Sequence, residues 1–108
     1  MDTLSAELNS FLVCLALHPD TVPHEAVHYT EHLLRLLDPD DEADLAAYYG
    51  LFGAGQEALA DLAARRSLTP EDMMERIDRS LRRLAVTPEW QVIRQCAAGR
   101  HGARSRQQ

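Results

Sequence analysis

The sequence predicts an all-α fold of six short helices in one compact domain. Apolar residues recur at the i, i+3, i+4 spacing of a helix with one buried face, and no stretch shows the period-two alternation of a strand. Four proline-marked starts, with acidic residues after the proline, separate the helical segments. A chain of 108 residues, 45% of them hydrophobic, is long enough to build one modest core.

Taken in order, the apolar stripes and their breaks set the expected boundaries. Leu4, Leu8, Phe11 and Leu12 define the first helix, which stops at His18-Pro19-Asp20. Asp38 and a first-turn proline open the third helix, and glycines close it. The expected helices span about residues 2–17, 23–37, 39–52, 56–66, 70–85 and 88–98.

The fourth and fifth helices form the hairpin that organises the chain. Its sequence, residues 59–84, reads LADLAARRSLTPEDMMERIDRSLRRL. Thr69 is a good N-cap, and Pro70 occupies the first helical position, where its missing N–H is not needed. Two helices joined by a tight turn, the second one longer, have the outline of a helix-turn-helix.

Charge is unevenly distributed, with a net charge of −6 overall. Residues 1–45 carry −9, residues 46–85 are neutral, and residues 86–108 carry +3. The acidic residues 1–45 should repel phosphate. Residues 1–98 are expected to form a single helical domain, and residues 99–108 a disordered basic tail. The acidic N-terminus, the two unpaired cysteines and the lack of a long apolar run predict a cytoplasmic protein of bacterial type that does not enter a membrane.

Residues 37–84 resemble the fourth conserved region of bacterial primary-type sigma factors. The most specific matches are Tyr49-Gly50-Leu51 after the third helix and Leu81-Arg82-Arg83-Leu84 at the end of the fifth. The resemblance implies a helix-turn-helix core and a role with RNA polymerase. The family usually has glycine where this chain has Ser67, and several promoter-contacting arginines where it has Pro70, Asp72 and Met74. The family's promoter contacts therefore do not transfer to this chain.

The fifth helix is expected to bury Met73, Ile77, Leu81 and Leu84 and to expose a mixed charged face. Three acid–base pairs at i, i+4 (Asp72–Arg76, Glu75–Arg79 and Asp78–Arg82) should satisfy that face. The end of a recognition helix that enters the groove is its N-terminal end, which is acidic here. Any nucleic-acid binding is expected to be weak and non-specific, through Arg79, Arg82, Arg83, Arg100, Arg104 and Arg106.

The histidines of residues 24–32 and the cysteine Cys14 have simple structural interpretations. His24, His28 and His32 follow one helix face, and residues 24–28 read HExxH. A zinc site is one interpretation, but Pro23 places His24 in the first turn, so an exposed polar face is expected instead. Cys14 is expected to be inert in the core. No catalytic set and no cofactor motif is recognised, which predicts a protein that is not an enzyme and needs no cofactor.

The sequence therefore predicts a small, non-enzymatic regulatory protein of the transcription machinery that acts mainly by binding protein. RNA polymerase or a regulatory protein is the expected partner, Trp90 the expected exposed anchor, and a homodimer a further alternative. The contrasting hypothesis is a helical adaptor or chaperone unrelated to transcription, in which the helix-turn-helix is only packing geometry.

Overall fold

The computed structural model describes the backbone of residues 2–106 and the side chains of residues 2–97. Within these residues every regular element is a helix, which confirms the predicted all-α class. The elements are α1 (Thr3–Leu17), the short 3-10 helix η1 (Pro19–Thr21), α2 (His24–Leu34), α3 (Pro39–Tyr49), α4 (Leu59–Arg65), α5 (Pro70–Ala85) and α6 (Pro88–Arg106).

Side-chain caps fix three of the helix starts. Asp2 Oδ1 accepts the Ser5 N–H at 2.8 Å at the start of α1. Thr69 Oγ1 accepts the Asp72 N–H at 3.1 Å and so caps α5, as predicted. Thr87 Oγ1 accepts the Trp90 N–H at 3.1 Å at the start of α6. Each cap satisfies one of the backbone donors that a helix leaves unpaired at its N-terminus.

Four predicted boundaries differ from the structure. The second helix ends at Leu34 instead of near Leu37, and the third ends at Tyr49 instead of near Phe52. The fourth helix begins at Leu59 instead of near Gln56, so residues 51–58 form a loop. The last helix was expected to end before Gly99 but continues to Arg106. The predicted disordered tail, residues 99–108, lies outside the described side chains, and residues 107–108 lie outside the described backbone.

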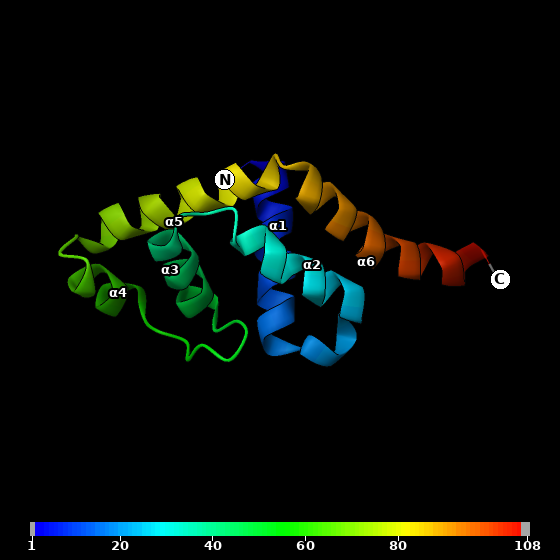
Figure 1. The fold of residues 1–108 in the computed structure, drawn as a ribbon, viewed down its shortest axis with the longest axis horizontal. Helices are drawn as coiled ribbons and strands as arrows, with labels where there is room; N and C mark the ends of the chain where they lie inside the picture. The colour runs from blue at the N-terminus through cyan, green and yellow to red at the C-terminus, as the bar shows by residue number, and fades with distance from the viewer. Residues whose placement is uncertain (1, 107–108) are drawn as a thin grey trace.

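Helix α5 is the element on which most of the others pack (Figure 1). Helices α1, α3 and α4 contact it, whereas α2 packs against α6. The molecule measures 53 × 25 × 20 Å, with α4 and the end of α6 at opposite ends of the long axis. No helix in the described part of the chain is both long and apolar enough to cross a bilayer.

A mainly leucine core joins these helices. The predicted face of α5 is confirmed, since Met73, Ile77, Leu81 and Leu84 are all buried. The largest fully buried side chains of the whole core are Leu8, Leu12, Leu33, Leu34, Leu45, Leu51, Leu62, Met73, Ile77, Leu81, Leu84 and Ile93. Burial of about 25 cal/mol per Å² of apolar surface is the main term that stabilises such an arrangement.

Candidate functional site

The predicted helix-turn-helix is formed by α4, a turn at residues 66–69, and α5, with α3 packed against both helices. The turn needs one left-handed residue, and Ser67 supplies it with φ = 59°. The following Leu68 N–H donates to the Ala63 carbonyl at 2.8 Å, which closes the end of α4. A position that adopts this conformation favours glycine, so Ser67 is in an unfavourable backbone conformation.

A buried carboxylate on α3 holds this motif together. Asp44 is 1% exposed. Arg66, at the end of α4, donates Nε–H to Asp44 Oδ2 and Nη2–H to Oδ1, both at 3.0 Å. Arg76 of α5 and Arg65 of α4 place nitrogens at 3.4 Å and 3.8 Å from the same carboxylate. One acid therefore ties α3 to both helices of the motif, which sequence analysis did not predict.

The neighbouring acids of α3 complete this network. Asp41 Oδ1 lies 2.7 Å from Arg76 Nη2, and Asp40 Oδ1 lies 3.5 Å from Arg66 Nη1. The hydrogen bond with Asp44 is the main cause that raises the pKa of Arg66 above its usual value. Arg66 in the turn and Arg76 in the second turn of α5 are therefore committed to acids of the same chain and offer little free charge to a phosphate.

Two of the three charge pairs predicted within α5 are not observed. Arg76 turns to Asp41 on α3 instead of pairing with Asp72. Asp78 and Arg82 form no ion pair within the described residues, and Asp78 Oδ1 is buried without a hydrogen-bond partner there. The pair Glu75–Arg79 is present at 3.8 Å between two exposed side chains. A tertiary partner on α3 outcompetes the local i, i+4 partner, because local pairs contribute only about 0.2–0.5 kcal/mol.

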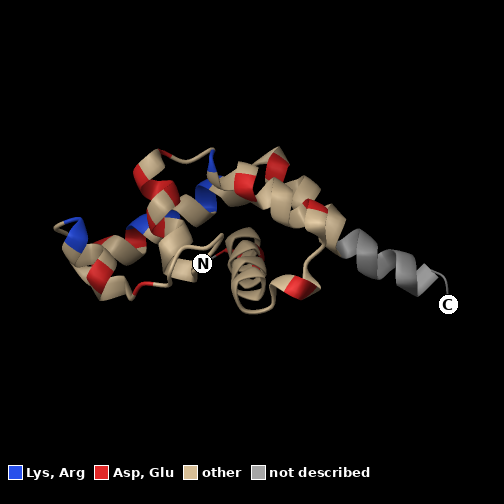
Figure 2. Cartoon of the chain, turned by 60° about the horizontal axis from the view of Figure 1, so that its bottom comes forward, with Lys and Arg blue, Asp and Glu red and all other residues tan. Residues whose placement is uncertain are grey.

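The outer face of α5 carries both signs of charge. Glu71, Asp72 and Glu75 are exposed near its N-terminus, and three of the predicted nucleic-acid ligands, Arg79, Arg82 and Arg83, are exposed further along. Acidic and basic residues are interspersed over this part of the chain (Figure 2). The side chains of the other predicted ligands, Arg100, Arg104 and Arg106, lie outside the described residues.

Trp90 is buried, so the prediction that it is an exposed anchor is wrong. Its side chain is 2% exposed, and its ring centroid lies 5.5 Å from that of Phe11 on α1. The indole Nε1 is buried without a hydrogen-bond partner. A tryptophan at the start of a helix can serve as readily to close a core as to bind a partner, and here it fills the space between α1 and α6.

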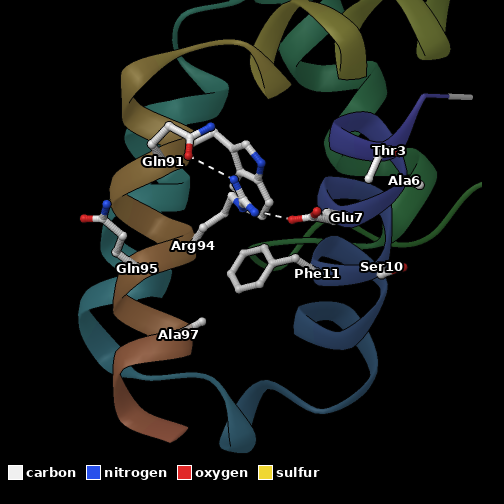
Figure 3. Close-up of a pocket in the computed structure, with 10 residues that line it drawn as sticks. Thr3, Ala6, Glu7, Ser10, Phe11, Gln91, Arg94, Gln95 and Ala97 are labelled. Atoms are coloured by element: carbon white, nitrogen blue, oxygen red, sulfur yellow. Dashed lines mark hydrogen bonds and ion pairs between the residues drawn. The ribbon is translucent and has the colours of Figure 1, made fainter. Parts of the chain in front are cut away.

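A groove of 760 Å³ lies next to the contact between Phe11 and Trp90, between α1 and α6 (Figure 3). Phe11 and Trp90 form its apolar wall, and Ala6 and Ala97 add small side chains. Arg94 bridges the two helices, with Nε 2.9 Å from Glu7 Oε2 and Nη1 donating to Gln91 Oε1 at 2.9 Å. Because its charges are paired across the groove, the site carries no net charge that would select a ligand.

The two histidines of the HExxH motif, His24 and His28, and the following His32 are exposed on α2. His24 is the first residue of that helix, and the rings of His28 and His32 meet edge to face with centroids 4.7 Å apart. In the described part of the chain, no three His, Cys, Asp or Glu side chains come together in a cluster able to hold a metal ion. The arrangement of these residues does not resemble the three-ligand zinc site that the motif serves in proteases.

Cys14 is exposed, which corrects the prediction that it lies in the core. The buried stripe of α1 runs through Ser5, Leu8, Leu12 and Leu15. Cys14 lies two positions from Leu12, or about 200° around the helix, and therefore points away from the core. Its Sγ lies 3.6 Å from Thr21 Oγ1.

Comparison of the chain with protein-family models, with curated proteins and with solved structures found no match.

Proposed function

We propose that this chain is a small, cytoplasmic, non-enzymatic regulatory protein of the transcription machinery that acts mainly by binding protein. In this proposal the helix-turn-helix is a folding scaffold, and its contact with DNA is at most weak and non-specific. The sigma-like motifs supply the link to transcription, and the electrostatics of the motif supply the preference for protein over DNA.

The observation that carries the proposal is the neutralisation of the helix-turn-helix by α3. Arg66 in the turn and Arg76 in the second turn of α5 are bound by Asp40, Asp41 and Asp44. A DNA-reading helix-turn-helix presents free donors at the N-terminal end of its second helix. In this chain that end presents acidic side chains, which repel phosphates and have no hydrogen-bond donor to offer them.

The exposed arginines further along α5 do not compensate for this charge. Arg79 lies 3.8 Å from Glu75, and Arg82 and Arg83 follow at the end of the helix. With four acids and four arginines between residues 70 and 85, α5 has no net charge. Binding through these arginines would depend on counterion release and would fall steeply with salt.

The test is direct binding of the purified chain to RNA polymerase, measured by analytical size exclusion and calorimetry. The proposal predicts a stoichiometric complex that survives in the triple variant Arg79→Gln, Arg82→Gln, Arg83→Gln, because the contact does not use that face. An affinity pull-down from the native host, analysed by mass spectrometry, should recover polymerase subunits. Recovery of only unrelated proteins, with no polymerase binding, would favour the adaptor hypothesis instead.

A further inference from the structure

The loop after α3 presents an aromatic ring on a left-handed turn. Gly50 ends α3 with φ = 77°, and Phe52 and Gly53 follow with φ = 52° and 82°. The Ala54 N–H donates to the Leu51 carbonyl at 2.9 Å and closes this tight turn. Positive φ at both central residues is the pattern of a type I′ turn, in which Asn-Gly is preferred. A phenylalanine at the first of these positions is unfavourable for the backbone.

The side chain of Phe52, the residue with this strained backbone, is also poorly covered. Phe52 is 42% exposed, although Leu51 beside it is buried. An apolar side chain that is strained and half in water does little for folding, and such strain gathers at sites where binding or catalysis uses it. The position of this ring therefore points to a contact outside the chain.

Two hollows lie on either side of the ring. The first, of 320 Å³, lies between α2 and α3 and is lined by Leu34, Ala46 and Phe52 among others. The second, of 300 Å³, lies between the end of α1 and α2 and is lined by Leu15, Val27 and Phe52 among others. Because both hollows share Leu51 and Phe52, they form one apolar strip with the ring at its centre, which we call the Phe52 strip.

Acidic side chains border the Phe52 strip. Glu31 and Glu42 line the first hollow, and neither forms an ion pair within the described residues. Arg35 is the single basic residue lining either hollow. Most of the residues that line the strip beside the loop belong to residues 1–45, which carry −9. This potential attracts a basic partner and repels nucleic acid.

The basic end of a second copy of this chain does not fit the strip. Residues 97–108 contain arginines but no apolar side chain larger than alanine. The two hollows need large apolar side chains to fill them, because alanine would leave most of each one empty. The occupant must combine basic residues with large apolar ones, spaced so that two anchors reach the two hollows.

We infer that the Phe52 strip is the docking site for a basic amphipathic helical segment of a partner protein. Its apolar residues seat on either side of Phe52, and its arginines or lysines face Glu31 and Glu42. This mode of recognition places the apolar face of a helix in a groove, with i, i+3, i+4 and i+7 residues as anchors. The inference deepens the proposed function and rests on it for the identity of the protein that carries the segment.

The test uses three labelled peptides, each about four helical turns long. The first has leucines at i, i+3, i+4 and i+7 with flanking arginines, the second has glutamates in place of the arginines, and the third has serines in place of the leucines. Fluorescence anisotropy with the full chain should show binding of the first peptide only. Binding should weaken as salt rises, because the rim contacts are exposed charge pairs.

Phe52→Asn is the decisive variant, because asparagine suits the left-handed turn while removing the ring. We expect the melting temperature to be unchanged or raised and the Kd for the first peptide to rise by about tenfold or more, as for loss of a central anchor. The double variant Glu31→Gln, Glu42→Gln should weaken binding several-fold and reduce its salt dependence. Val86→Asn is the matched control, since Val86 is 73% exposed and lies at the end of α5, away from the loop of residues 51–58 (Figure 1).

Absence of binding, equal binding of the acidic peptide, or an equal effect of Phe52→Asn and Val86→Asn would overturn the inference. The outcome is separable from that of the proposed function. If polymerase binding occurs but is indifferent to Phe52→Asn, and the peptide does not bind, the docking site is wrong and the proposed function stands. If the basic peptide binds at Phe52 and polymerase does not bind at all, only the proposed function fails.

Discussion

Asp44 is the position where a single conservative change should most disturb the helix-turn-helix. Asp44→Asn keeps the size of the side chain and one acceptor oxygen but removes the charge that faces three arginines. Breaking a buried ion pair by removing one partner costs about 3–5 kcal/mol. Arg66 and Arg76 are about a quarter exposed, at 26% and 25%, and keep Asp40 and Asp41 as partners. We therefore expect the lower end, about 3 kcal/mol of unfolding free energy.

The assay is urea unfolding followed by circular dichroism, supported by thermal melting. A loss of about 3 kcal/mol should lower the melting temperature by about 10–15 °C in a domain of this size. Asp40→Asn is the control: its side chain is 72% exposed and lies 3.5 Å from Arg66, so the cost should stay below about 1 kcal/mol. In a double-mutant cycle with Arg66→Gln, the two changes should be strongly non-additive. A loss below about 1 kcal/mol for Asp44→Asn, similar to Asp40→Asn, would refute the network as a source of stability.

Three further predictions concern local features of the fold. Ser67→Gly should raise the unfolding free energy by about 0.5–1 kcal/mol, because glycine adopts the left-handed backbone without strain. The control Ala64→Gly in α4 should lower the unfolding free energy by about 1 kcal/mol. A lower unfolding free energy for both variants would contradict the assigned turn. Thr69→Ala should cost about 1 kcal/mol through loss of the α5 cap, and Thr69→Ser should largely retain it, as urea titrations can show. Fluorescence of the single tryptophan should be blue-shifted and resist quenching by iodide until the protein unfolds, because Trp90 is buried; easy quenching in the folded state would restore the exposed-anchor interpretation.

The sequence was sufficient to predict the helices because their signals are local. The cap at Thr69 and the stripe through Met73, Ile77, Leu81 and Leu84 depend only on residues within one helix, and the structure confirms both. The predicted start of the fourth helix is too early, because residues 56–58 are compatible with a helix. A long-range hydrogen bond from the Glu57 N–H to the Ala47 carbonyl, at 2.9 Å, holds these residues in the loop instead.

Burial and long-range contacts depend on which helix faces pack together, so the spacing of residues along the sequence could not predict them. Asp44 follows the acids of the first turn of α3, so the sequence alone suggests one more solvated carboxylate. Only the fold brings Arg66 and Arg76 to it. Trp90 was interpreted as an anchor because nothing in the sequence shows that α1 supplies Phe11 to cover it. Phe52 was predicted to end the third helix, and the neighbouring Gly50 and Gly53 were the one local signal of a turn, but its positive φ depends on the closed turn itself.

The proposal that this helix-turn-helix does not read DNA can be tested by a titration of DNA with the full chain. Fluorescence anisotropy at physiological salt would compare a duplex with a minus-35-like promoter element with a random duplex of equal length. We expect equal, weak affinities for the two duplexes, with Kd values on the order of 10⁻⁴–10⁻⁶ M at best, and both affinities should fall steeply as salt rises. Sub-micromolar binding that prefers the promoter-like duplex would contradict the proposal, because base readout would then occur despite the neutralised arginines and the acidic start of α5.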